Sequence, residues 1–529
     1  MSTLAPVSKT RSFSTVFLIE MWERFGYYGM QALIIYYMVE RLGFQDTPAN
    51  LTWGAAAALI YVAPAIGGWV GDKFFGTRRT MLLGACVLTC GYALMVVPAA
   101  SSEFLFLALG VIVVGNGLFK ANAGNLVRKI YEGDDSKIDS AFTIYYMAVN
   151  IGSMVSMLLT PAIKTYFNAP FHGQLTWLLG THAAAFFGDN LGWHIAFAVS
   201  CAGLLVGLGN YAVMRHTLNH IGSEPDHQPF RFWRLLAVIA GGVAVVFISA
   251  FILKYGNVAR IFVYMAGACV LAIFAYLIAK SHHSEKAGLI AALILVVETV
   301  FFFIFYQQMS TSLNLFALRN VNPAFNVSGL HLWNWDPAQF QAFNPIWIFI
   351  LSPILALLYT HFGKRGKDFS IATKFALGFA AVAVGFFVYG ASAHFLTSPG
   401  KTTSWVMVWG YGFGSLGELL TSGLGLAFIA RYVPARMGGF MMGAYYVAVG
   451  VSQYLGGVVA TFASVPSTIT NPVQMMPIYT RLFNSLGIAG LVCTLIALAV
   501  LPLMRRLNAA HHKHNAATDI SLPTVDAEQ

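Results

Sequence analysis

The stretch FLIEMWERFGYYGMQALIIYYM, residues 17–38, is the most informative part of the sequence for the fold. It is long and apolar enough to cross a bilayer as a helix, yet it carries Glu20, Glu23 and Arg24 near its start. Residues three and four apart share one face of a helix. Because each charge in a spanning helix costs roughly 2.5–3.5 kcal/mol, this face must line a bundle interior or a water-filled cavity.

The charged face has two interpretations. In the structural one, Glu20 and Arg24 form an ion pair that locks two helices together. In the functional one, the face is a proton and substrate site, which Tyr27, Tyr28 and Gln31 continue one and two turns later.

The composition identifies the class of protein. Of 529 residues, 57% are hydrophobic and only 10% are charged, which is typical of an all-α membrane protein and not of a soluble domain. The apolar runs lack the alternation of β-barrel spans. The net charge of +10 comes from Lys and Arg in loops, as the positive-inside rule predicts, so we expect no nucleic-acid partner.

The apolar runs predict fourteen transmembrane helices. With this number, every basic connection falls on the side of the N-terminus, which places both termini in the cytoplasm. The predicted spans are 14–40, 51–72, 80–99, 103–130, 139–165, 190–214, 232–253, 258–280, 287–314, 343–362, 370–396, 402–432, 438–463 and 480–505.

The loops at 67–80 and 357–370 look like counterparts in a duplicated chain. Six spans in each half leave one pair over, and the pair at 232–280 is the natural insertion. Long external loops are expected at 166–189, 315–342 and 464–479. The predicted domains are an N-terminal six-helix bundle (1–215), an inserted helix pair (216–286), a C-terminal six-helix bundle (287–507) and a disordered cytoplasmic tail (508–529).

The first of these loops holds Gly68, Asp72 and Arg78 and resembles the cytoplasmic loop signature of the major facilitator superfamily. Small residues allow helix ends to pack closely, and Asp72 could cap a neighbouring helix N-terminus or pair with an arginine. We expect a gating or structural role for these residues.

Three further polar residues lie inside predicted spans. Lys120 is a titratable group that could receive a substrate carboxylate, although a lysine can also extend to the cytoplasmic interface. Asn150 can serve equally as a ligand or as a hydrogen bond between helices. Glu418 is the second acid that we place in the central cavity.

Four motifs in order resemble the proton-dependent oligopeptide transporter family, from about residue 14 to residue 505. The motifs are Glu20-x-x-Glu23-Arg24-Phe25-x-Tyr27-Tyr28, Gly117-Leu118-Phe119-Lys120-x-Asn122, Tyr146-Met147-x-x-Asn150-x-Gly152 and Gly417-Glu418-Leu419-Leu420. The sequence of residues 308–319, QMSTSLNLFALR, resembles that of the bacterial di- and tripeptide permease branch. Members of this branch carry two extra helices between their halves.

The resemblance implies the major facilitator fold and symport of di- and tripeptides with protons by alternating access, in the inner membrane, with no cofactor, no metal and no catalytic residue. We expect the chain to function as a monomer. By position, the implied roles are proton coupling by Glu20, Glu23, Arg24 and Lys120; peptide carboxylate binding by Arg24 and Lys120; amino-group binding by Asn150, Asn344 and Glu418; and backbone or side-chain contacts by Tyr27, Tyr28 and Tyr61.

The sequence departs from the family pattern at two places. Gln31 stands where many members have a second arginine, and Gln307 and Gln308 stand about where many have a carboxylate. Because the arginine and the carboxylate are both absent, neither charge is left buried without its partner. We therefore hypothesise that neutral hydrogen bonds close the outer gate.

Three other functions remain as alternatives. A related symporter could carry another small organic anion, nitrate or a drug, but the Glu20, Glu23 and Arg24 set favours proton coupling. An intramembrane enzyme is disfavoured because no metalloprotease, serine-hydrolase or paired-aspartate motif is present. A channel is disfavoured because the polar residues are spread over several spans without a filter-like repeat.

Overall fold

The computed structural model describes residues 8–97, 101–168, 191–327, 330–365, 369–421, 429, 432–433 and 437–520. Apart from two short hairpins, the described structure is helical. The N-terminal helices are α1 (Lys9–Tyr36), α2 (Asp46–Trp69), α3 (Thr77–Val96), α4 (Ser102–Ile130), α5 (Asp135–Asn168) and α7 (Leu191–Met214). The helices that follow are α8 (Glu224–His227), α9 (Phe232–Lys254) and α10 (Gly256–Lys280).

The C-terminal helices are α11 (His283–Tyr306), α12 (Ser312–Asn320), α13 (Phe343–Gly363), α14 (Ile371–Gly390), α15 (Trp405–Thr421), α17 (Gly438–Ala460) and α18 (Pro472–Ile520). Short 3-10 and π segments join them: η1 (Tyr37–Arg41), η2 (Val70–Phe75), η4 (Arg215–Leu218), η5 (Gln307–Ser310), η6 (Pro337–Ala342), η7 (Ala391–His394) and η10 (Thr461–Ala463). The antiparallel hairpins pair β1 (Ala324–Val327) with β2 (Leu330–Asn334) and β3 (Leu396–Ser398) with β4 (Lys401–Thr402).

Twelve helices in the described part of the chain are long and apolar enough to cross a membrane. Neither α1 nor α15 is among them. The first carries the charged residues discussed above, and the second is described for only 17 residues. Fourteen spans therefore remain a prediction, with α1 and α15 as the additional pair.

Two predicted segments differ from the structure. Residues 508–520 were expected in a disordered tail, but α18 continues as one helix from Pro472 to Ile520. Its sequence there is rich in alanine, a strong helix former, so the helix extends beyond the apolar span. The external loop at 315–342 also contains the end of α12, the β1–β2 hairpin and η6. Most of the loop at 166–189, and residues 422–428 of the span at 402–432, lie outside the described residues.

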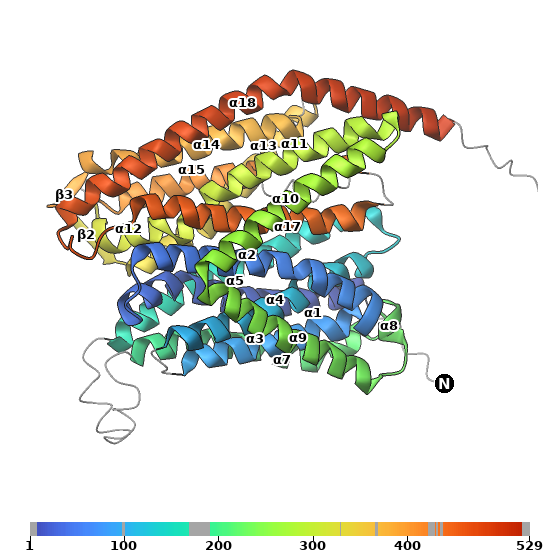
Figure 1. Ribbon diagram of the computed structural model, residues 1–529, viewed down its shortest axis with the longest axis horizontal. Coiled ribbons are helices and arrows are strands. Elements are labelled where there is room, and N and C mark those ends of the chain that lie inside the picture. Colours follow the sequence, from blue (N-terminus) through green and yellow to red (C-terminus); the bar gives the residue numbers. More distant parts are fainter. Residues whose placement is uncertain are drawn as a thin grey trace, which may run out of the picture.

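Figure 1 shows the helices running broadly alongside one another, with the strands at one end and α8 and the C-terminal end of α18 at the other. We call these the strand end and the α8 end. The two helices of the predicted insertion, α9 and α10, run obliquely across the others (Figure 1). Helix α9 packs against α4, and α10 packs against α17. The pair thus contacts helices from early and late parts of the chain.

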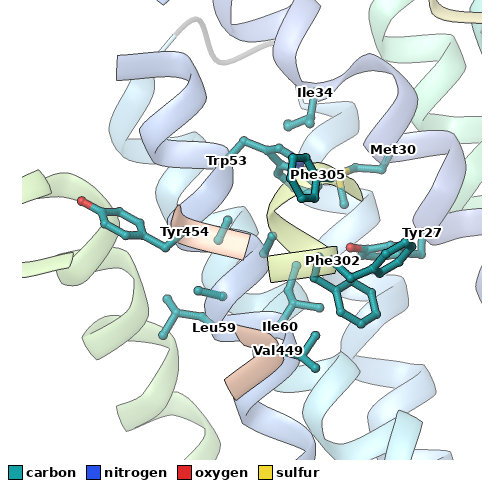
Figure 2. Packing of buried hydrophobic residues seen from close by; sticks show 14 of the residues in the cluster. Tyr27, Met30, Ile34, Trp53, Leu59, Ile60, Phe302, Phe305, Val449 and Tyr454 are labelled. Atoms are coloured by element: carbon teal, nitrogen blue, oxygen red, sulfur yellow. The ribbon is translucent and has the colours of Figure 1, made fainter. Parts of the chain in front are cut away.

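One apolar core joins the early and late helices. Figure 2 shows Tyr27 and Met30 of α1 and Trp53 of α2 in the same cluster as Phe302 of α11 and Val449 of α17. All five are buried. Because lipid tails are as apolar as these side chains, the close packing of this cluster, and not transfer from water, joins α1 and α2 to the C-terminal helices.

Candidate functional site

The charged face of α1 is buried, as predicted. Glu20, Glu23 and Arg24 are 3%, 0% and 4% exposed. The Arg24 Nε atom lies 3.2 Å from Glu20 Oε1 and 2.5 Å from Glu23 Oε2. Because these ion pairs lie within one helix, they do not lock two helices together, which was the structural interpretation.

The ion-pair cluster is not fully satisfied. Glu20 Oε2, Glu23 Oε1 and Arg24 Nη2 are buried and have no hydrogen-bond partner among the described residues. An unsatisfied charged group in a buried site is costly, so a water molecule or ligand that supplied the missing hydrogen bonds would stabilise this arrangement.

A narrow cavity, with about 30 Å³ accessible to water-sized molecules, adjoins this cluster. Arg24 of α1 and Lys120 of α4, the two cations singled out in the sequence, both line it. Tyr27, Tyr28 and Tyr61 also line it. The other lining side chains come from α1, α2, the end of α11, η5 and α17: Gln31, Trp53, Ala57, Ile60, Tyr306, Gln307, Met309, Ser310 and Gln453.

Lys120 is held in the cavity by the close approach of α2 and α4. A Cβ atom built on Gly117 would lie 2.7 Å from the Ala63 Cβ, so only glycine allows this contact. The approach places Lys120 Nζ 4.3 Å from the centre of the Tyr61 ring. Among the described residues, no carboxylate lies within 4 Å of Lys120, so its ammonium group remains available to an anion.

The predicted acid Glu418 forms a second polar cluster. Its Oε2 accepts a hydrogen bond of 2.6 Å from Asn344 Nδ2, and its Oε1 accepts one of 3.2 Å from the Tyr146 hydroxyl. Ser415 completes the cluster, since Asn344 Nδ2 also donates to its Oγ at 3.1 Å. The Tyr146–Glu418 bond joins α5 to α15.

The structure does not bring every predicted amino-group ligand to the cavity. Asn150 donates to the Tyr146 carbonyl oxygen within its own helix at 2.9 Å. Neither Asn150, Asn344 nor Glu418 is among the residues that line the cavity beside Arg24. The prediction missed Tyr146 and Ser415. Tyr146 stood in the quoted motif, but nothing in the sequence paired it with Glu418.

An ion pair closes the strand end between α2 and α12. Arg319 Nη1 and Nη2 donate to the two carboxylate oxygens of Asp46 at 2.6 and 2.7 Å. Arg319 also donates to the Tyr479 hydroxyl, and Asp46 accepts from the Val465 amide. The strand end thus carries a charged pair. The closure of the outer gate by neutral hydrogen bonds stays a prediction.

Neutral bonds do contribute at the same end of the molecule. Trp53 Nε1 donates to Ser310 Oγ at 3.0 Å, and the Tyr36 hydroxyl donates to the Asn314 carbonyl oxygen at 2.6 Å. Gln31 and Gln307 both line the cavity, but Gln307 Nε2 has no partner among the described residues. The Asp46–Arg319 pair lies at other positions of the sequence than these two glutamines.

A second charged contact closes the strand end between α5 and the start of η6. Lys164 Nζ lies 3.8 Å from Asp336 Oδ2 and 3.5 Å from Glu40 Oε2. Thr165 donates to Asp336 at 2.5 Å. Together with the Asp46–Arg319 pair, this contact places charged bonds on two sides of the strand end.

The predicted gating loop is organised by a partner that the sequence analysis missed. Asp72 accepts from Thr77 Oγ1 and Asn125 Nδ2, both at 3.3 Å, and has no arginine partner among the described residues. The N-terminus of α3 is capped instead by Ser223 and Asp226. Ser223 Oγ accepts from the Thr77 amide, and Asp226 accepts from the amides of Arg78 and Arg79.

Small residues have the expected role in this loop. A Cβ atom on Gly68 would lie 3.3 Å from the Ala121 Cβ, so α2 and α4 are in close contact here. Arg78 Nη1 donates to the Leu218 carbonyl oxygen at 2.5 Å. The loop is thus bound to the segment that leads to α8.

No group of three or more His, Cys, Asp or Glu side chains in the described part of the chain could hold a metal ion.

Comparisons with known proteins agree with this architecture. A family model described as the POT family matches residues 78–480. The chain is 39% identical to dipeptide and tripeptide permease B of Salmonella typhimurium, over 96% of this chain and 98% of that protein. It is 40% identical to the protein of the same name from Edwardsiella piscicida, again over 96% and 98%.

Solved structures of peptide transporters are also similar to this chain. The crystal structure of tetrameric PepTSo2 is 63% identical and has a TM-score of 0.83, covering 94% of this chain and 99% of that chain. A structure of the peptide transporter POT in complex with alafosfalin is 28% identical, with a TM-score of 0.73 and coverages of 94% and 95%. These matches confirm the predicted fold class, an all-α membrane protein with the major facilitator fold. The chain belongs to the POT family.

Proposed function

We propose that this chain is a proton-coupled symporter that imports di- and tripeptides across the inner membrane by alternating access. The observation that carries the proposal is a buried cavity lined by Arg24 and Lys120 in a member of a family whose relatives are named dipeptide and tripeptide permeases. Transport requires no bond to be made or broken in the substrate. The polar residues therefore act by binding and by exchanging protons.

The cavity suits the carboxylate end of a peptide. Two cations, Arg24 and Lys120, line one space, and charge-assisted hydrogen bonds to a carboxylate are among the strongest in proteins. Tyr27, Tyr28 and Tyr61 provide hydroxyl groups and ring faces that tolerate many side chains. The Glu418, Asn344 and Tyr146 cluster offers the opposite charge to the peptide ammonium group, with Asn150 nearby on α5. In this role, the cluster must come to face the cavity during the transport cycle.

Proton coupling is assigned to Glu20 and Glu23. Both carboxylates compete for one arginine, and each has a buried oxygen without a hydrogen-bond partner. Protonation of Glu23 would weaken its hold on Arg24, which could then bind the peptide carboxylate together with Lys120. One proton thus replaces one ion pair, and substrate binding depends on the proton.

We infer that this structure represents a state that is closed at the strand end. The Asp46–Arg319 and Lys164–Asp336 contacts hold this end together. The positive-inside pattern places the strand end outside the cell and the α8 end, with Gly68, Asp72 and Arg78, in the cytoplasm. We propose that bundles 1–215 and 287–507 rock about the cavity, with 216–286 as an inserted pair.

A single chain is proposed to be the transporting unit, because it supplies the groups proposed above to bind the peptide and the proton. The tetrameric assembly described for PepTSo2 would then consist of complete units.

Competition binding tests the proposed substrate. Labelled dialanine should be displaced by unlabelled di- and tripeptides but not by N-acetyl-dialanine or dialanine amide, because each capped analogue lacks one of the two charges. Equal competition by a capped analogue and a free peptide would contradict recognition of both termini. Displacement by nitrate or another small organic anion alone would support the alternative substrate class.

A further inference from the structure

A cationic pocket lies at the α8 end, away from the substrate cavity. Lys73 of η2, Arg128 and Lys129 at the end of α4, and Arg234 at the start of α9 line it, with Asp72 and Glu224 as the acids. Both acids already accept hydrogen bonds from neutral side chains, namely Thr77 and Asn125 for Asp72 and Gln228 for Glu224.

The cations of this pocket lack anionic partners. None of the four has a carboxylate within 4 Å among the residues that the structure describes. The Nε atom of Arg234 is buried without a hydrogen-bond partner. Four cations against two engaged acids leave a pocket that is complementary to an anion.

An apolar groove continues from this pocket along the membrane-facing surface. It lies between α2, α4 and α9, with Phe74, Val70 and Ala237 at one end and Leu59 and Ile252 at the other. About 510 Å³ of it is accessible to water-sized molecules. The distance from Ala237 to Ile252 is about 22 Å along a helix, more than the roughly 15 Å of hydrocarbon in one leaflet.

Pocket and groove meet at Arg234 and Phe74. The guanidinium carbon of Arg234 lies 5.8 Å from the centre of the Phe74 ring. Beside it, the rings of Phe230, Phe232 and Trp233 are 55–63% exposed. Tryptophan rings such as that of Trp233 are enriched at the level of the headgroups in membrane proteins, and the cations beside it fit that depth. The cationic pocket is therefore at headgroup depth and the groove extends into the hydrocarbon.

We propose that this composite surface binds one anionic phospholipid, with its phosphate in the cationic pocket and an acyl chain in the groove. Figure 1 shows α9 starting close to α8 and crossing the N-terminal helices, so the lipid would fill the space on one side of this crossing. The lipid would link the inserted α9 to η2 and α4. The inference goes beyond peptide transport and is independent of it.

The test is retention of phosphatidylglycerol, measured by native mass spectrometry on purified full-length protein reconstituted with equal phosphatidylglycerol and phosphatidylcholine. In a triple variant, Arg128→Gln/Lys129→Gln/Arg234→Gln, the retention of phosphatidylglycerol should fall at least about tenfold. The reason is that each cation near a lipid surface contributes to the attraction. The matched control is Arg505→Gln/Arg506→Gln, which removes two exposed cations from α18.

A second variant tests the groove. A Cβ atom at Gly241 meets nothing within 4 Å, so Gly241→Leu should fold normally and fill the groove. Its control is Gly209→Leu on α7, another helical glycine with open space at its Cβ position. Gly241→Leu should lower retention of phosphatidylglycerol, and Gly209→Leu should not.

The outcomes separate the possible ligands. Loss in the triple variant and in Gly241→Leu, with unchanged controls, would support the phospholipid site. Loss in the triple variant alone, together with binding of inorganic phosphate, would show a phosphate site without a lipid and would overturn the proposal. Equal retention by all variants would also overturn it.

Discussion

Glu23 is fully buried, and its carboxylate competes with that of Glu20 for Arg24. If Glu23 carries the coupling proton, Glu23→Gln should abolish proton-driven accumulation of dialanine while counterflow exchange continues. The amide cannot be deprotonated, but it leaves Arg24 free to bind substrate. Uptake and exchange by the same reconstituted protein would check this.

Glu298→Gln provides the control. Glu298 is another acid within a predicted span, with a buried oxygen that has no partner, but it does not line the cavity. The Glu298→Gln variant should still accumulate dialanine when a proton gradient is imposed. Loss of uptake and exchange together in Glu23→Gln would instead mean that Glu23 has a structural role.

Lys120 should be required for both uptake and exchange, since it binds substrate in every proposed step. A charge-assisted hydrogen bond contributes roughly 1.5–3 kcal/mol, so Lys120→Ala should weaken dialanine binding about tenfold or more. Isothermal titration with dialanine measures this directly. Lys374→Ala is the matched control, because Lys374 Nζ lies over the Tyr359 ring at 4.2 Å but away from the cavity. An unchanged dissociation constant for Lys120→Ala would contradict its role.

At this scale, charge made the site predictable. Glu20, Arg24 and Lys120 stood out because ionisable groups in apolar spans need a reason to be there. Tyr146 and Ser415 could not be found in this way, because hydroxyl groups are common in membrane helices and their partner, Glu418, lies in a different helix.

The Asp46–Arg319 pair joins two elements, α2 and α12, in the state closed at the strand end. Breaking a buried pair by removing one partner costs up to roughly 3–5 kcal/mol, and less here because the Arg319 side chain is 17% exposed. Arg319→Gln should therefore shift the population toward opening at the strand end. Spin-label distances between α2 and the start of α18 should lengthen.

A double-mutant cycle is the control for this prediction. Asp46→Asn/Arg319→Gln should be less perturbed than the sum of the single changes, because the partners are removed together. Unchanged distances in both single variants would mean that the pair does not hold the gate.

The cap on α3 should be measurable as stability. Ser223→Ala removes the acceptor for the Thr77 amide and should lower the free energy of unfolding by about 0.5–2 kcal/mol. Asp226→Ala should cost more, since its buried carboxylate accepts from two amides of α3. The loss of unfolding free energy in Asp226→Asn, which keeps one acceptor oxygen, should lie between the losses in Ser223→Ala and Asp226→Ala. Thermal unfolding in detergent gives the order, and a Ser223→Ala protein as stable as the wild type would contradict the capping role.

At the scale of elements, the apolar runs predicted α9 and α10 within two residues, because lipid-facing helices have continuous apolar sequence. The strand end was harder to predict. The hairpins and η6 depend on contacts such as Asp336 with Lys164, which no local pattern encodes. The extension of α18 to Ile520 was missed because polarity was taken as evidence of disorder, although alanine-rich polar sequence also forms helices.

At the scale of the whole molecule, the family resemblance and the comparisons agree on fold and family. The number of spans, the division into two bundles and the cytoplasmic termini follow from apolar runs and loop charges, and they remain predictions. The proposed cycle needs the strand end to open while the cytoplasmic end closes, with the cavity between them alternately accessible.

Uptake of labelled dialanine into proteoliposomes tests this account most directly. An inward proton gradient is imposed and then collapsed with an ionophore, with Lys120→Ala protein as the inactive control. We predict accumulation above equilibrium that disappears when the gradient is collapsed. Folded protein that accumulates no dialanine, or accumulates it equally without the gradient, would contradict proton-coupled peptide symport.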